Sequence, residues 1–209
     1  MSPTGADQRQ EAVLLVGAPL CGKGTQARLL TTAYPQRFSH WESSAILRDY
    51  AATHDDALAR SVGEIFSGER LISPKLLGDE NLAAIISAYA KERADARTAL
   101  LDGVIRTAHQ AHLLADTFRV RLILTYAHAQ ITPEQLSARI VARARPGETT
   151  EQAMERIRTY ERTCAPLLTH YRRLPQEHRP RIGVIDASQE IPVVFKRTWG
   201  TLRHAGLLP

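Results

Sequence analysis

The chain has 209 residues, of which 44% are hydrophobic and 23% charged, a balance typical of a folded globule that needs no disulfide bonds. Its formal net charge of +5 fits either a solvated basic surface or a cleft for an anionic substrate, and the charge alone does not separate the two. Only 6% of the residues are aromatic, which argues against a broad stacking surface for single-stranded nucleic acid.

The cysteines and the N-terminus indicate where the protein resides. Cys21 and Cys164 form neither a CxxC pair nor a zinc-binding spacing, which favours a reduced, intracellular setting. Residues 1–10 are polar, unlike a signal peptide, and we expect them to form a frayed tail. No apolar run approaches the roughly 20 residues that span a bilayer. We therefore expect a cytoplasmic protein without a membrane partner.

The first half of the chain begins with a strand pattern. Residues 12–16 form a continuous apolar run, which is typical of a central parallel strand covered on both faces. The patterns that follow predict a helix over 22–33, a strand over 38–41, and helices over 44–52 and 74–91. Ser43 is the expected N-cap of the helix over 44–52, and Pro74 follows Ser73 as the first residue of the next. Residues 43–90 thus contain helices and no strand, which predicts a helical insertion.

Strands and helices alternate in the second half of the chain. The patterns predict strands over 99–101, 120–126 and 182–185, and helices over 107–115, 133–143, 151–171 and 191–204. Pro166 is expected to kink the longest of these helices, and residues 145–148 are expected to form a turn. The alternation predicts an α/β fold with a parallel sheet.

The most specific motif is Gly17-Ala-Pro-Leu-Cys-Gly-Lys-Gly-Thr25, which follows the first predicted strand and opens a helix. In the P-loop pattern, backbone N–H groups wrap a polyphosphate and the following helix N-terminus adds positive potential. Lys23 is then expected to reach the β- and γ-phosphates, and Thr25 to support Mg²⁺. A chance match to this pattern anywhere in the chain has a probability well below about 1%.

An acidic residue follows another predicted strand, in Leu100-Leu-Asp102-Gly103. Asp102 stands at the carboxyl end of that strand, where an aspartate that organises Mg²⁺ belongs. Aspartate at a strand end is more often only a cap, so this signal depends on the P-loop beside it.

Five segments, in the same order, resemble the adenylate kinase family. They are Gly17–Gln26, Ser43–Arg48, Leu101–Ala111, Arg139–Arg143 and Arg156–Leu167, within a match from Val13 to about Phe195. The resemblance implies a single P-loop kinase domain over residues 1–209. Its fold would be that of the P-loop NTPases, a three-layer α/β sandwich with a five-stranded parallel sheet in the order 2-3-1-4-5. It also implies an NMP-binding helical insertion at about 43–73 and a short lid without zinc at about 143–150.

The resemblance implies roles for the residues that match. ATP is expected to bind Gly17, Ala18, Pro19, Cys21, Gly22, Lys23, Gly24, Thr25 and Arg139. AMP is expected to bind Ser43, Arg48, Gly103, Arg106 and Gln110, with Gln110 on the adenine edge. The transferring phosphoryl group is expected among Lys23, Arg106, Arg143, Arg145 and Arg156, and Mg²⁺ near Thr25 and Asp102 through water. The implied reaction converts ATP and AMP into two ADP, in a monomer that binds no nucleic acid.

The chain departs from the family at four positions. Leu20 replaces a P-loop glycine, which costs about 1–2 kcal/mol if the position needs a positive φ. Ser44 and Ala45 replace a Gly-Asp pair, and Ile105 replaces a proline that has a cis peptide bond. Because a cis bond without proline costs about 3–4 kcal/mol, we expect a trans Val104–Ile105 bond and some displacement of Arg106. Three of these positions lie on the acceptor side.

Three other interpretations stay open at this point. The acceptor could be UMP, CMP or another small phosphate, because the departures concentrate on the acceptor side. The chain could also be a regulator that binds ATP without transferring phosphate. Nucleic-acid binding is the weakest alternative, since it depends only on a pI near 9.5 and has no motif.

Overall fold

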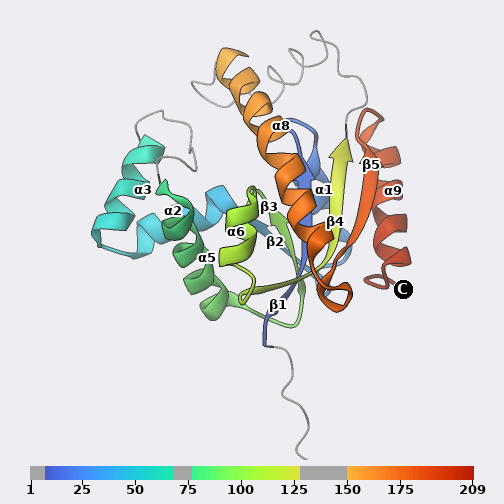
Figure 1. Cartoon of the computed structure of the whole chain (residues 1–209), viewed down its shortest axis with the longest axis horizontal. Helices are drawn as coiled ribbons and strands as arrows, with labels where there is room; N and C mark the ends of the chain where they lie inside the picture. The colour runs from blue at the N-terminus through green and yellow to red at the C-terminus, as the bar shows by residue number, and fades with distance from the viewer. Residues whose placement is uncertain (1–7, 68–76, 128–149) are drawn as a thin grey trace, which may run out of the picture.

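A parallel sheet of five strands forms the centre of the molecule (Figure 1). The fold is that of a computed structural model, which describes residues 8–67, 77–127 and 150–209, without the side chains of residues 67, 150, 152, 153 and 156. The strands are β1 (Gln10–Gly17), β2 (Phe38–Glu42), β3 (Thr98–Asp102), β4 (Phe118–Ala127) and β5 (Arg181–Asp186). They lie in the order β2-β3-β1-β4-β5, which confirms the predicted α/β class and strand order.

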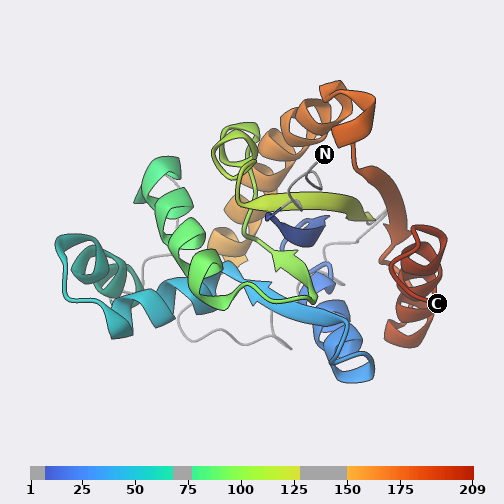
Figure 2. The ribbon, with the colours of Figure 1, turned by 90° about the horizontal axis from the view of Figure 1, so that it is seen from below.

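Helices cover both faces of this sheet (Figure 2). The helices are α1 (Lys23–Ala33), α2 (Ser43–Thr53), α3 (Ala57–Ser67), α5 (Asp79–Arg93), α6 (Ala108–Leu113), α8 (Thr150–Arg173) and α9 (Ile191–His204), with a short 3₁₀ helix, η1 (Gln176–His178). One apolar core lies between the sheet and α5, α6 and α8, and the other between the sheet and α1 and α9. These layers confirm the predicted three-layer sandwich. None of the described helices combines the length and apolar composition needed to cross a bilayer.

Strand β1 shows why the sheet forms here. Ala12, Leu14 and Val16 belong to one core, whereas Val13 and Leu15 belong to the other. All five are at most 5% exposed, as expected for a strand that is covered on both faces. Leu15 of β1 pairs in register with Asp102 of β3. The end of β1, and the glycine-rich loop after it, therefore lie beside Asp102.

Helices α2 and α3 stand beyond β2, at the left of Figure 1. Helix α2 packs against both α3 and α5. In the described part of residues 43–90 every element is helical, as predicted. Some predicted bounds fall outside the described residues or at their edge and stay predictions. They are the end of the insertion at residue 73, the lid at 143–150 and the helix over 133–143.

The prediction of Ser43 as an N-cap is wrong, and the helix predicted over 74–91 is interrupted at Gly78. Helix α2 begins at Ser43 itself, because the N-cap is Glu42 with extended backbone, and the Ser43 hydroxyl accepts a hydrogen bond from Arg106 instead. Helix α5 begins at Asp79, since Gly78 has φ 79° and ψ 152°, outside the helical region. The start predicted at Pro74 lies outside the described residues. Helix α8 continues through Pro166 as one helix.

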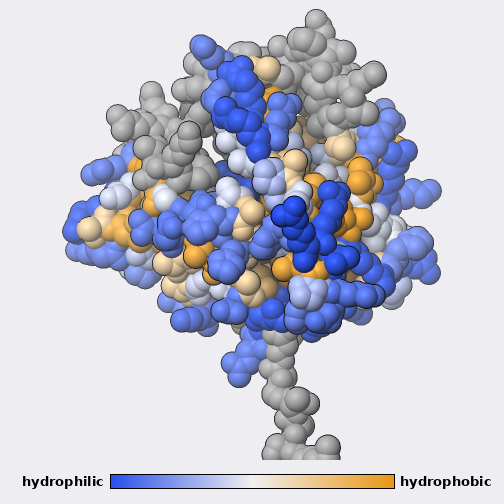
Figure 3. Space-filling view, viewed as in Figure 1, coloured by the Kyte–Doolittle hydropathy of each residue, from blue (hydrophilic) through white to orange (hydrophobic). Residues whose placement is uncertain are grey.

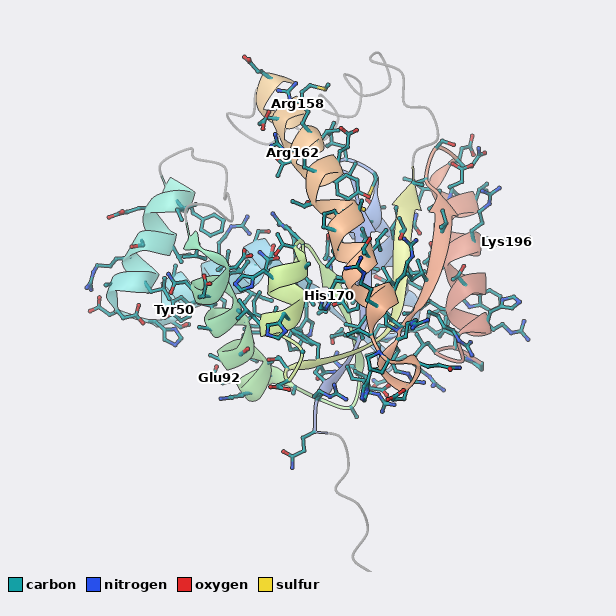
Figure 4. All side chains as sticks on the ribbon, in the orientation of Figure 1. Tyr50, Glu92, Arg158, Arg162, His170 and Lys196 are labelled. Atoms are coloured by element: carbon teal, nitrogen blue, oxygen red, sulfur yellow. The ribbon has the colours of Figure 1, made fainter. Side chains whose placement is uncertain are left out.

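The outer face of α8 is strongly hydrophilic (Figure 3), and Arg158 and Arg162 extend from it (Figure 4). Both guanidinium groups bond to Glu155, at 2.9 and 3.2 Å. The hydrogen bond from Arg158 is the main reason why the pKa of Glu155 is lowered. Part of the basic charge of this chain therefore lies on a solvated helix face, where it is paired with Glu155.

Candidate active site

The loop from Gly17 to Gly22 joins the end of β1 to the start of α1. Helix α1 begins at Lys23, with Gly22 as its N-cap, and no side chain of the described residues caps it. The first N–H groups of an α-helix have no partner within the helix, and they attract anions together with the helix dipole. The loop therefore offers the backbone donors that the P-loop motif predicts.

Gly24 permits the close approach of this helix to β3. A Cβ atom at Gly24 would lie 2.8 Å from Oδ2 of Asp102, closer than real Cβ contacts allow. Lys23 extends along the same junction, with its Nζ 3.9 Å from Oδ1 of Asp102. The Gly-Lys-Gly sequence thus places a lysine and an aspartate side by side at the carboxyl edge of the sheet.

Asp102 is held ionised by its neighbours. Burial alone raises the pKa of this carboxyl, but the His40 ring and the charges of Lys23 and Arg106 outweigh it and lower the pKa below its ordinary value. The Nε2 atom of His40 lies 3.6 Å from Oδ2, which is an electrostatic contact rather than a hydrogen bond. His40 was not predicted as part of this site, although its side chain lies on the same face of β2 as that of Asp102 on β3.

Leu20 has a positive φ, which is the condition under which a side chain at this P-loop position is strained. Its φ is 68°, in the left-handed region that favours glycine. We expect Leu20→Gly to raise the free energy of unfolding by about 1 kcal/mol, because the strain of a side chain in this region is removed. Chemical denaturation measures this change, and a variant that is less stable than the natural protein would contradict the strain.

Two hydrogen bonds fix Arg106 at the same edge of the sheet. Its Nε donates to the carbonyl of Gly103 at 2.8 Å, and its Nη2 donates to Oγ of Ser43 at 3.0 Å. Gly103 has φ 71°, a conformation that favours glycine, and a Cβ there would also lie 2.7 Å from Nη2 of Arg106. The described peptide bonds are all trans, which confirms the prediction for Val104–Ile105. The displacement of Arg106 stays a prediction.

Gln110 lies behind Arg106 and is 0% exposed. Its Oε1 accepts the backbone N–H of Arg106 at 2.7 Å, and its Nε2 donates to Oδ1 of Asp79 at 2.7 Å. The amide that the resemblance assigns to the adenine edge is thus engaged on both ends by the protein. Asp79 was not foreseen as part of this site.

Arg48 extends from α2, and its guanidinium carbon lies 4.9 Å from the ring centre of Phe66 on α3. A cation over an aromatic face is stabilised by about 0.5–1 kcal/mol at an exposed site. If Arg48 grips an acceptor phosphate, Phe66→Leu is expected to raise the KM for the acceptor about two- to fivefold and leave the KM for ATP unchanged. Steady-state kinetics test this, and Arg48→Ala supplies the control background, in which Phe66→Leu should have no further effect. An equal rise of both KM values would contradict the role.

Several residues that were predicted for this site lie outside the part of the chain that the structure describes. Arg139, Arg143 and Arg145 fall in residues 128–149, and the side chain of Arg156 is also not described. Thr25 is described, and its Oγ1 accepts a long 3.4 Å contact from Arg28 one turn later. The structure therefore brings together Lys23, Asp102, Arg106 and Ser43, and leaves the lid-side arginines as predictions.

The described residues contain no group of three or more His, Cys, Asp and Glu side chains that could enclose a metal ion. A single ionised carboxylate, Asp102, lies beside the P-loop lysine. This arrangement fits Mg²⁺, which keeps much of its water and takes further oxygen ligands from bound phosphates.

The strand order, the glycine-rich loop before α1 and the lysine–aspartate pair at the carboxyl edge of the sheet are together typical of a P-loop nucleotide-binding protein. The sequence model of the family described as adenylate kinase matches residues 15–176. The chain belongs to the adenylate kinase family. It is an ATP-dependent phosphotransferase that acts on a nucleotide phosphate.

Similar proteins cover most of the chain. An adenylate kinase of Mycobacterium sp. (strain MCS) is 26% identical over 191 residues, which are 88% of this chain and 95% of that protein. An adenylate kinase of Prochlorococcus marinus (strain MIT 9301) is 28% identical over 185 residues, 87% of this chain and 93% of that protein. An adenylate kinase of Maricaulis maris (strain MCS10) is 28% identical over 165 residues, 76% and 84% of the two chains.

Proposed function

We propose that this chain transfers the γ-phosphoryl group of ATP to AMP and so produces two ADP, with Mg²⁺ bound alongside the nucleotides. The observation that carries the proposal is the position of Arg106. Its guanidinium is held by Gly103 and Ser43, near enough to Asp102 to lower the pKa of that carboxyl, and Asp102 also neighbours Lys23. Groups suited to a donor and an acceptor phosphate thus meet at one edge of the sheet.

On the donor side, the P-loop N–H groups and Lys23 would hold the β- and γ-phosphates of ATP. Thr25 and Asp102 would hold Mg²⁺ through water, and the metal would neutralise charge on the phosphate oxygens. Because the neighbours of Asp102 keep its pKa low, this carboxyl carries its negative charge at neutral pH.

On the acceptor side, the phosphate of AMP is already an anionic nucleophile, so no general base is needed. Catalysis then depends on positioning and on charge neutralisation. Arg106 and Arg48 would grip the acceptor phosphate, since planar guanidinium groups bond to phosphate oxygens in pairs. Ser43 would orient Arg106, to which it is already bonded.

The remaining roles are proposed from the resemblance. Arg139 would lie against the base of ATP, and Arg143, Arg145 and Arg156 would surround the transferring group when a lid at 143–150 closes. Closure of the lid and of the insertion at 43–73 would exclude water, which otherwise competes with the acceptor for ATP. The monomeric state and the lack of a nucleic-acid partner stay predictions.

A coupled assay tests the proposal by measuring ADP formed from ATP with AMP, UMP, CMP and GMP in turn. We expect two ADP for each ATP consumed with AMP. Faster turnover with UMP or CMP would support the second candidate, a kinase of another nucleoside monophosphate, which the enclosure of Gln110 favours. ATP binding without any ADP from these acceptors would rule out both and leave a nucleotide-binding regulator.

A further inference from the structure

A groove of about 580 Å³ lies between α6 and α8. Helix α6 has six residues and packs against α8, which has 24, so it covers only part of the longer helix. Ala108, the first residue of α6, lines one side of the groove, and residues of α8 line the other, with Leu174 just after the end of α8. The volume is in the range of about 300–1,000 Å³ that is typical of small-molecule sites. None of the lining residues was assigned to ATP, AMP or Mg²⁺.

Apolar side chains form much of the groove. Ala108, Ala165, Pro166 and Leu174 line it, and both Ala165 and Pro166 are exposed to solvent on α8. Two of these four residues are alanines, whose short side chains leave space between the two helices. A ligand that covers these side chains removes apolar surface from water. The groove therefore suits a ligand with an apolar body.

Polar and basic side chains lie along the same wall. Pro166, Thr169, His170 and Arg173 follow the i, i+3, i+4, i+7 spacing, which places them on one face of α8. Figure 4 shows His170 on the part of α8 that lies beside α6. No acidic residue lines the groove in the described part of the chain. This wall of the groove is therefore basic.

The two basic side chains of this wall lack a counterion. Neither the Arg173 guanidinium nor the His170 ring forms an ion pair or a hydrogen bond with any of the residues that the structure describes. Arg158 and Arg162, which lie earlier on the same helix, are both paired with Glu155. Arg173 thus differs from these two arginines, because its charge is left available for an anion from solution.

The His170 ring contributes a hydrogen-bond donor rather than a second charge. Its partial burial, and then the nearby charge of His112 on α6, lowers the pKa of His170. At neutral pH the ring is therefore mainly uncharged and supplies one N–H donor, whereas Arg173 carries the positive charge. Carboxylates and phosphates fit these groups, since their paired oxygens match the planar guanidinium.

We infer that the groove between α6 and α8 binds a small organic anion, whose carboxylate or phosphate bonds to Arg173 and His170. The apolar body of this ligand lies along Ala165, Pro166 and Leu174. Because the groove shares no lining residue with the proposed nucleotide sites, its ligand should not compete with ATP. A neutral molecule with the same apolar body lacks the bond to Arg173 and should bind more weakly.

Calorimetric titration of the full chain with octanoate and with octyl phosphate, both below the concentrations at which they form micelles, tests the inference. Octanol is the neutral probe with the same apolar body. Arg173→Gln removes the charge, and Ala165→Trp fills the groove. Both residues are exposed on α8, so both variants should fold. Arg172→Gln is the matched control, because Arg172 is the neighbouring exposed arginine and does not line the groove.

We expect at least one of the two anions to bind with one molecule per chain, about tenfold more tightly than octanol. Arg173→Gln and Ala165→Trp should each weaken this binding about tenfold, whereas Arg172→Gln and saturating ATP should leave it unchanged. The inference would be overturned if neither anion bound, if ATP displaced the anion, or if octanol bound as tightly. An equal loss of binding in Arg173→Gln and Arg172→Gln would overturn it too, since any surface arginine would then serve.

Discussion

Lys23→Met is expected to lower kcat by about 10³-fold, because a preorganised charge at the β- and γ-phosphates is lost in a partly enclosed site. Met keeps the length and apolar stem of Lys, and the side chain of Lys23 is only 19% exposed, so packing should be preserved. The loss should appear in the coupled ADP assay with saturating ATP and AMP. ATP should also bind more weakly, as measured by equilibrium titration.

Lys196→Met provides the matched control for this experiment. Lys196 lies on α9 and extends away from the carboxyl edge of the sheet (Figure 4). It should leave kcat unchanged. If Lys23→Met kept the activity of this control, the loop between β1 and α1 would not be the site of phosphoryl transfer.

Arg106→Ala is expected to lower kcat/KM for the acceptor by about 10²–10³-fold, since both a charge and a planar pair of donors are removed. Arg106→Lys should recover only part of this loss, because an ammonium group restores the charge but cannot bond to two phosphate oxygens in one plane. The KM for ATP should change little in both variants. Kinetics with the acceptor varied at fixed ATP measure the effect.

The control for Arg106 is Arg203→Ala on α9, where the guanidinium lies 5.4 Å from the ring centre of Trp199. This variant removes an equal charge far from the proposed acceptor site, so kcat/KM should not change. An Arg106→Ala enzyme as active as Arg203→Ala would mean that the acceptor phosphate binds elsewhere.

Local patterns predicted the parts of this molecule that depend on near neighbours in the chain. The apolar run in β1 alternates between two cores, as a strand covered on both faces must, and the run ends at the glycine where the loop begins. The α9 helix begins and ends where its pattern predicted. The P-loop was recognisable because its spacing, strand and helix all follow one another in sequence.

The parts of the site that were not predicted depend on contacts between residues far apart in the chain. His40 meets Asp102, and Asp79 meets Gln110, only because β2, β3, α5 and α6 assemble side by side. Ser43 resembles an N-cap locally, but its hydroxyl is used by an arginine 63 residues later. The helix predicted over 74–91 is not continuous, because Gly78 interrupts it with a positive φ. No local sequence pattern predicts which residues come into contact across such long stretches of chain.

The proposed function requires two nucleotide sites that meet at the carboxyl edge of the sheet, one at Lys23 and one at Arg106. An inhibitor that joins two adenosines through five phosphates tests this directly in an equilibrium titration. The account predicts that one inhibitor binds per chain, that ATP and AMP each compete with it, and that both Lys23→Met and Arg106→Ala weaken it. Competition by ATP alone, with Arg106→Ala binding as tightly as the natural protein, would contradict it.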